Sequence, residues 1–241
     1  MTWSIVALDG SGALGVAVAS RFFAVGALCP AVLARRGALS TQALINPLYA
    51  RAGLALLAEG LAPAAIIERV TGTDPGRDVR QLHLVDAHGE TAAWTGRGCI
   101  EWCGHRTFPG FSVAGNMLAG PQVLEATAAA YQAHGEQPFA ERLIAAMQAG
   151  EAAGGDKRGK QAAALRIHTT EPYPVLDLRV DDHPEPLREL RRLHDVSLER
   201  FQPFMECLPR EGDPAGITDR AVIEERIARF QAARALRTEK A

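Results

Sequence analysis

Several features that mark particular classes of protein are scarce in this sequence of 241 residues. Its four cysteines, Cys29, Cys99, Cys103 and Cys207, are too few and too irregularly spaced for a disulfide framework, so we expect thiols in a reducing compartment. No apolar run approaches the roughly 18–20 residues that a membrane span requires. The N-terminus also lacks the basic region and apolar stretch of a signal peptide. These absences predict a cytoplasmic protein.

An excess of charge of one sign is also missing. The 26 basic and 28 acidic residues leave a net charge of −2, which argues against nucleic acid or an anionic membrane as a partner. Cys99 and Cys103 lie four residues apart with His105 nearby, but no second Cys/His pair follows at the spacing of a zinc finger. We therefore expect no metal, and nothing in the sequence predicts a cofactor.

What is present is typical of a globular protein, with 47% hydrophobic and 22% charged residues. The length suits one large domain with or without an appendage. The most informative stretch is residues 2–21, in which two apolar, β-prone runs flank the turn residues Asp9 to Gly12. This pattern predicts a β-hairpin. Because both faces of each run are apolar or small, we expect strands covered on both sides.

Thr2 is the first residue of that hairpin once Met1 is removed. A free N-terminal threonine carries a hydroxyl nucleophile and an α-amine whose pKa of about 7.7–8.0 suits a general base. Such a residue needs no histidine or aspartate from elsewhere, so sequence spacing cannot reveal it. Threonine is also a good strand residue, and that explanation suffices for Thr2 taken alone.

Later segments extend the pattern. Residues 81–86 and 90–95 predict a second hairpin, residues around 99–102 a short strand, and residues 111–116 a strand that leads into a Gly-rich loop. The opening run TWSIVALDGSGALGVAVASR, followed by these strands, resembles proteasome-type β-subunits, in which a nucleophilic threonine begins a hairpin. With STQALINP, the Gly-His at 104–105, GNMLAG, AGGDKRGKQAAAL and DLRVDDHPEP, the chain from residue 2 to about 193 resembles a bacterial family catalogued as a domain of unknown function.

This resemblance implies a fold of the N-terminal-nucleophile (Ntn) hydrolase type and a chemistry, but no known reaction. We take Thr2, Ser20 and Asn116 as the catalytic candidates, with Asn116 in the loop where proteasome-type enzymes steady the oxyanion. The proteasome's auxiliary aspartate falls on Ser20 or Arg21, and its lysine falls near Arg35 and Arg36. Arginine cannot be deprotonated, so that auxiliary machinery is not reproduced.

The remaining elements are predicted from proline and glycine positions, which mark helix starts and ends, and from hydrophobic periodicity. Asn46-Pro47 predicts the start of a helix that ends near Gly60, and Pro63, Pro121 and Pro138 open three more. Residues 161–167 and 176–180 are predicted strands. With the resemblance, this order predicts an α+β fold, a four-layer αββα sandwich of the Ntn-hydrolase type over residues 1–183. Residues 184–241 are predicted to form a C-terminal helical appendage, with one amphipathic helix from about 187 to 204 and another over 218–237, which packs on the domain or on a second subunit.

Candidate substrate-binding residues come from three places. Gly154 to Gln161 is a glycine-rich charged stretch in which the backbone can approach a ligand and cations can hold a carboxylate. A second group lies before the predicted helix at 47, where amides can orient a substrate amide; Asn46 is equally explained as a helix cap. The third place is around the N-terminal hairpin and the Gly-His motif. The candidates are Arg21, Thr41, Gln42, Asn46, His105, Asp156, Lys157 and Arg158.

The sequence thus favours an amidohydrolase in which Thr2 attacks a small, anionic amide substrate and its own amine relays the proton. The alternative is a non-catalytic binding or scaffold protein that kept the sheets and lost the chemistry, which the missing auxiliary residues favour. A third hypothesis is self-cleavage before Ser40 or Thr41. We also expect a homo-oligomer, most simply a dimer.

Overall fold

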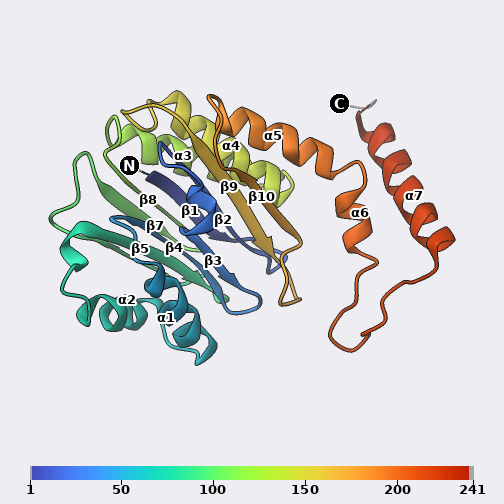
Figure 1. Cartoon of the computed structure of the whole chain (residues 1–241), viewed down its shortest axis with the longest axis horizontal. Helices are drawn as coiled ribbons and strands as arrows, with labels where there is room; N and C mark the ends of the chain where they lie inside the picture. The colour runs from blue at the N-terminus through green and yellow to red at the C-terminus, as the bar shows by residue number, and fades with distance from the viewer. Residues whose placement is uncertain (1, 239–241) are drawn as a thin grey trace. The chain divides into compact units, whose positions relative to one another are not determined.

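The computed structural model describes residues 2–238, and its first unit is built on two β-sheets packed face to face (Figure 1). The larger sheet has six strands, in the order β10 (Leu176–Val180), β9 (Ala162–His168), β2 (Leu14–Ser20), β1 (Thr2–Leu8), β8 (Phe111–Asn116) and β7 (Gly104–Phe108). The smaller sheet has four, in the order β3 (Pro30–Leu33), β4 (Gly37–Ala43), β5 (Arg80–Asp86) and β6 (Thr91–Thr95). Neighbouring strands within each sheet are antiparallel.

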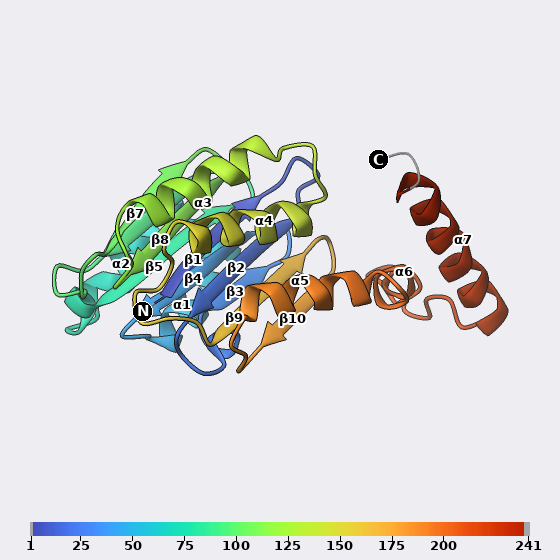
Figure 2. The ribbon, with the colours of Figure 1, turned by 90° about the horizontal axis from the view of Figure 1, so that it is seen from above.

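Helices cover the outer face of each sheet. The pair α3 (Gln122–Ala133) and α4 (Phe139–Ala152) lies on the larger sheet, as Figure 2 shows from above. The pair α1 (Pro47–Ala58) and α2 (Pro63–Gly72) lies on the smaller sheet. Two short 3₁₀ helices, η1 (Val25–Ala27) and η2 (Arg77–Val79), occupy connecting segments. The resulting αββα sandwich confirms the fold class expected from the sequence.

The first hairpin forms as predicted. The register pairs Thr2 with Ser20 and Leu8 with Leu14, and a carboxylate oxygen of Asp9 accepts hydrogen bonds from the backbone amides of Ser11 and Ala13. An aspartate that bonds its own turn in this way supplies the partners that the turn backbone otherwise lacks. Nearly all of β1 and all of β2 is buried, because one sheet or helix layer covers each face.

Two expectations about local structure were wrong. Residues 99–102 form a connection, and the strand lies at β7, which begins only at Gly104. The helix expected from about 187 to 204 is two helices, α5 (Pro186–Ser197) and α6 (Phe201–Met205). The last helix, α7 (Arg220–Thr238), matches its prediction.

The chain divides into two compact units, the first ending at Leu190 and the second beginning at Arg191. In the second unit, both terminal nitrogens of Arg200 pair with the carboxylate of Glu224, and the side-chain amide of Gln231 donates to the carbonyl oxygen of Glu199. No helix within residues 2–238 combines the length and apolar character needed to cross a membrane.

Candidate functional site

Thr2 lies at the start of the central strand of the larger sheet, and its side chain faces the layer between the two sheets. Its hydroxyl is 3.1 Å from the hydroxyl of Ser20, its partner on β2. On the other side, the register pairs it with Asn116 of β8. Only 3% of Thr2 is exposed. The three catalytic candidates therefore occupy adjacent strand ends in a single sheet.

The inter-sheet layer beneath Thr2 is polar for about half of its length. Alternate positions on four strands turn polar side chains inward, and all of these side chains are buried. We call them the polar half; they are Ser4 on β1, Ser40 and Gln42 on β4, Gln81 and His83 on β5, and Ser112 and Asn116 on β8. The far end of the same layer is apolar, with Val6, Leu14, Val16, Val32, Ala38 and Val85.

Gln81 is the centre of the polar half. Its amide nitrogen donates to the backbone carbonyl oxygens of Gly115 (2.7 Å) and Gly104 (3.2 Å) and lies 3.0 Å from the hydroxyl of Thr95. Because a backbone carbonyl can only accept, these contacts fix which end of the Gln81 amide is nitrogen. The amide oxygen of Gln81 then accepts from the side-chain nitrogens of Gln42 (3.1 Å) and Asn116 (2.8 Å).

Asn116 also donates to the carbonyl oxygen of Thr2 at 3.4 Å. Both hydrogens of its amide are therefore used inside the protein. The side chain of Asn116 thus holds Thr2 in place, and it has no donor left for an oxyanion.

The same chain of donors assigns the tautomer of His83. The oxygen of Gln42 accepts the hydroxyl hydrogen of Ser4 at 2.6 Å, so the contact of 2.7 Å between Ser4 and Nε2 of His83 needs its hydrogen on the ring. Nδ1 of His83 then accepts from the hydroxyl of Ser112 at 2.8 Å. Burial lowers the pKa of His83 to about 3, which keeps the ring neutral.

Beside Thr2, the segment at 154–160 is tied to the end of β2. The buried carboxylate of Asp156 accepts from the backbone amide of Arg21 at 2.9 Å and from that of Arg158 at 2.8 Å. The guanidinium of Arg21 donates in turn to the carbonyl oxygen of Arg158 at 2.9 Å. Gly159 has a φ of +107°, and a Cβ there would lie 2.9 Å from that guanidinium. The structure thus brings Arg21, Asp156 and Arg158 together.

A pocket of about 180 Å³ opens next to this segment. Its walls include Trp3, Ala19, Ser20, Gly155, Asp156 and Lys160. Thr2 itself does not line it, because Trp3 and Ala19 point to the other face of the sheet, and Ser20 is the residue that the pocket and Thr2 share. Its one ammonium group, on Lys160, pairs with the carboxylates of Glu185 (2.6 Å) and Glu151 (3.2 Å). The pocket is smaller than the roughly 300–1,000 Å³ of drug-sized sites, and suits only a small group.

Two other candidates lie elsewhere. Thr41 and Asn46 are on the α1 side of the smaller sheet, where the hydroxyl of Thr41 donates to the carbonyl oxygen of Asn46. Asn46 caps α1 by accepting from the amide of Leu48 at 3.1 Å, and its own amide donates to Asp74. Neighbouring strand residues point to opposite faces, so Gln42 joins the polar half and Thr41 does not. Ser40 and Thr41 are fully buried inside β4.

His105 and Lys157 lie at the edges of the site. Nδ1 of His105 on β7 is 2.9 Å from the hydroxyl of Thr95, which links the ring to Gln81. Burial lowers the pKa of His105. The ammonium of Lys157 donates to the carbonyl oxygen of Glu101 at 2.7 Å and so ties the segment at 154–160 to the connection before β7. Within residues 2–238, no group of three or more metal-ligating side chains gathers.

The backbone at this end of the sandwich is strained. Four non-glycine residues in the described chain have positive φ, and three of them lie at or after strand ends on the Thr2 side: Ala24 (53°), Ala43 (68°) and Met117 (52°). The left-handed region costs an L-residue about 1–2 kcal/mol. Strain of this kind gathers at functional sites, because it persists only where the surroundings enforce it.

Sequence reasoning missed Ser4, Gln81, His83 and Ser112. Each of them points inward from a strand that also turns apolar residues inward. The alternation of polar and apolar residues along such a strand therefore does not show which polar side chains are buried. Four such strands, all polar toward the same end of the sandwich, were the available signal. Which strands face one another is decided by tertiary packing.

One solved structure shares this architecture over most of its length. The crystal structure of protein SPO2555 from Silicibacter pomeroyi, titled as family-model DUF1028, superimposes with a TM-score of 0.84 and is 32% identical, covering 90% of this chain and 96% of that one. Anbu (ancestral beta-subunit) from Yersinia bercovieri is a distant match, with a TM-score of 0.37 and 12% identity over 81% of this chain and 94% of that one. No curated protein matches the sequence. A family model matches residues 2–190, and the chain therefore belongs to the family of unknown function DUF1028.

Proposed function

We propose that this protein is an amidohydrolase of the N-terminal-nucleophile type, acting on a small anionic amide with Thr2 as nucleophile. The observation that carries the proposal is the position of Thr2. It is the first residue of a central strand, its hydroxyl is bonded to Ser20, and Ser20 in turn lines a small pocket at the same strand end. A residue whose hydroxyl and amine sit together at a strand start needs no further base.

The reaction begins with removal of Met1, because only then is the amine of Thr2 free. The hydroxyl oxygen of Thr2 attacks the amide carbon, and the amine takes the hydroxyl proton. That proton passes to the leaving nitrogen as the C–N bond breaks, which leaves an ester on Thr2. Water, deprotonated by the same amine, then cleaves the ester and releases the carboxylic acid.

The surrounding residues have supporting roles in this proposal. Ser20 orients the hydroxyl of Thr2, and Asn116 and Gln81 hold the strand that carries it. Arg21 is exposed and gives one of its donors to Arg158. A guanidinium has five donors in all, so we assign Arg21 to the substrate carboxylate, supported by the Asp156 carboxylate that holds its backbone.

The test is covalent labelling of the N-terminus. Intact mass first establishes whether Met1 is absent. A β-lactone that acylates hydroxyl nucleophiles should then add one equivalent to the wild type, with the modification mapped to Thr2. We expect Thr2→Ala to lose labelling, Thr2→Ser to retain it, and Thr107→Ala, a change at an exposed threonine of β7, to leave it unaltered. Equal labelling of wild type and Thr2→Ala contradicts the proposal.

Two observations favour the non-catalytic alternative. Thr2 is 3% exposed, and the positions of the proteasome's auxiliary residues hold Ser20, Arg21, Arg35 and Arg36. In that case the protein binds a small molecule without cleaving it. A mass that retains Met1, together with ligand binding and no labelling, selects this alternative. Cytoplasmic location and a homodimer belong to both versions of the proposal; light scattering of the purified protein measures the second.

A further inference from the structure

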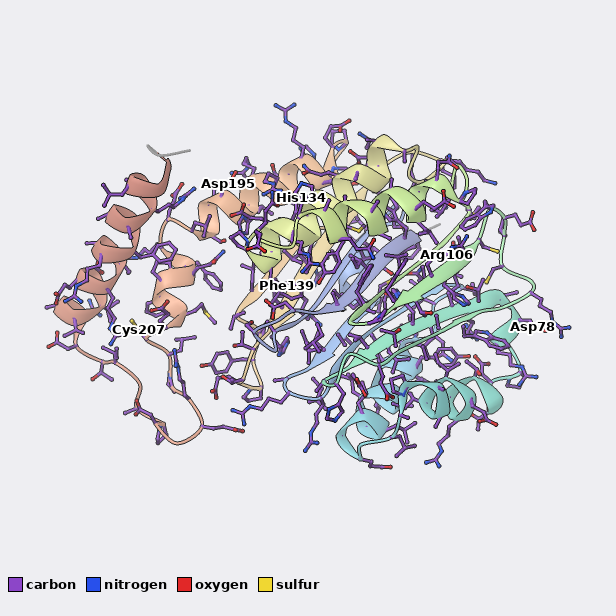
Figure 3. The ribbon with its side chains drawn as sticks, turned by 180° about the vertical axis from the view of Figure 1, so that it is seen from behind. Asp78, Arg106, His134, Phe139, Asp195 and Cys207 are labelled. Atoms are coloured by element: carbon purple, nitrogen blue, oxygen red, sulfur yellow. The ribbon has the colours of Figure 1, made fainter. Side chains whose placement is uncertain are left out.

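The exposed large apolar side chains of residues 2–190 all lie at one end of the sandwich. They are Phe22, Phe23, Leu28, Leu44, Leu48 and Ile100, between 42% and 69% exposed, and we call them the apolar rim. The strand register places them at the Thr2 end, since β2 and β4 end there and β3 and β7 begin there. In Figure 3, Asp78, just before β5, marks this end, and Phe139 marks the opposite one.

Two of the segments that carry the rim adjoin each other. The backbone amide of Thr41 donates to the carbonyl oxygen of Cys29 at 3.1 Å, and Ile45 packs against Val25 and Cys29. The segment that carries Phe22, Phe23 and Leu28 therefore adjoins the segment that carries Leu44. Ile100 lies on the other side of Thr2, where its carbonyl oxygen accepts from the amide of Met117.

Two residues of the rim stand next to strained backbone. Ala24 follows Phe23 directly, and Ala43 precedes Leu44, and both have the left-handed conformation that alanine disfavours. Left-handed alanines and exposed large apolar side chains thus gather at the same end as Thr2, and each of these features is typical of a functional surface.

The arrangement is that of a ligand site. Interfaces between proteins have an apolar centre and a polar rim. Here the apolar side chains stand outside, and the strand ends that they flank carry Thr2, Ser20, Gln42 and Asn116, which are themselves buried. A largely apolar lining around a few convergent polar groups is typical of small-molecule sites. Arg21 precedes Phe22, so a cation is continuous with the rim.

We propose that the substrate is an N-acyl amino acid with a medium or long aliphatic acyl chain. The acyl chain lies on the apolar rim, the amide carbonyl reaches Thr2, and the carboxylate binds Arg21. This inference rests on the proposed function and narrows its substrate from a small anionic amide to an amphipathic one.

The experiment measures binding to the full chain carrying Thr2→Ala, so that no hydrolysis intervenes. The probes are N-hexanoylglycine and N-decanoylglycine, titrated calorimetrically below the concentration at which the longer one aggregates. Each fully buried methylene is worth about fourfold in affinity, so we expect the decanoyl compound to bind at least about tenfold tighter. Adding Phe22→Ser and Phe23→Ser should reduce that ratio below about threefold.

The matched control is Phe201→Ser, which removes a phenylalanine of the second unit with 45% exposure, close to the 49% of Phe22. It should leave the ratio unchanged. Leu48→Ser, on the first turn of α1, provides a second rim variant should the double change fail to fold. Equal affinity for the two probes overturns the proposal. The proposal is also overturned if the wild type is a dimer that the rim substitutions dissociate. It is overturned as well if the protein sediments with phosphatidylglycerol vesicles through the rim while the affinity for the two probes does not depend on chain length.

The two proposals fail separately. If binding depends on acyl-chain length but Thr2 is not labelled, the proposed ligand class is supported and the proposed hydrolase activity is contradicted. If the wild type instead cleaves N-acetylglycine while longer acyl chains improve neither binding nor kcat/KM, the hydrolase activity is supported and binding of an acyl chain on the apolar rim is contradicted.

Discussion

The two halves of the inter-sheet layer solve the same packing problem by different means. At the far end, Val6, Leu14 and Val85 fill the space with apolar volume, which is tolerant in geometry and non-directional. At the Thr2 end, Ser4, Gln81 and His83 fill it with directional hydrogen bonds to one another's neighbours on facing strands. A satisfied polar network fixes side-chain positions more sharply than apolar packing does. The apolar end therefore contributes mainly to holding the two sheets together, and the polar end fixes the positions of the side chains around Thr2.

The largest expected effect is from breaking the centre of the polar half. In Gln81→Leu, the amides of Gln42 and Asn116 lose their acceptor and the carbonyl of Gly115 loses its donor. Each buried unsatisfied group costs about 1–3 kcal/mol, so we expect a loss of about 3–5 kcal/mol in the free energy of unfolding, measured with urea. Gln132→Leu, at an exposed position of α3, should change it by less than about 0.5 kcal/mol. If the free energy of unfolding falls no more in Gln81→Leu than in Gln132→Leu, the hydrogen bonds of Gln81 do not hold this end of the sandwich together.

A smaller effect is expected at the other end. Val85→Ala removes two buried methyl groups from the apolar half, and we expect a loss of about 2 kcal/mol. Labelling of Thr2 by the β-lactone should keep its wild-type rate, because the cavity forms away from the strand start. A labelling rate that falls with Val85→Ala would show that the two halves are coupled.

The pH dependence of stability separates the halves further. The pKa of His83 is about 3 in the folded protein and about 6.5 when unfolded, so the unfolded chain binds more protons between these values. The stability from the neutral ring is fully present above pH 6.5 and is lost as pH falls toward 3. We expect His83→Gln to lack a loss of about 1 kcal/mol that the wild type shows between pH 6.5 and 5.5. His105 and His168, whose pKa values burial also lowers, titrate in both proteins, so parallel curves would contradict a neutral His83.

The smallest effect is expected at Ser40. Its hydroxyl lies 3.2 Å from that of Ser4 and 3.4 Å from the oxygen of Gln42, distances at the long end for hydroxyl hydrogen bonds. Since Ser4 and Gln42 bond each other at 2.6 Å, Ser40→Ala should cost only about 0.5–1 kcal/mol in urea unfolding. The same variant tests self-cleavage: the wild type should run as one band on a denaturing gel, and two bands that Ser40→Ala abolishes would revive that hypothesis.

Part of the candidate site follows from strand register alone. Once 2–8 and 14–20 form a hairpin, Thr2 and Ser20 must be partners, and the strand at 111–116 brings Asn116 beside them. Thr41 shows where this reasoning stops. It is adjacent to Gln42, so only one of the two can face Thr2, and choosing between them requires knowing which face of β4 meets the larger sheet.

Local propensity also misplaced some elements. Gly104 to Phe108 mixes glycine and charged residues, and it forms a strand because β8 pairs with it. Tertiary contact overrides a weak local preference there. The break between α5 and α6 is instead local: Pro203 has no N–H for the carbonyl of Glu199, and a proline is tolerated only in the first turn of a helix, so α6 starts anew at Phe201.

The sequence by itself determined the hairpin with Thr2 at its start, the helices opened by proline, and the family to which residues 2–190 belong. These depend on turn chemistry, hydrophobic period and motif order, all of which are local. Only the tertiary structure decided that Gln81 and His83 meet Ser4 and Asn116, that Asp156 holds Arg21, and that six exposed apolar side chains surround one end. Each of these arrangements joins segments that are distant in the chain, and the contacts of Gln81 and His83 exist only because the two sheets stack in one register.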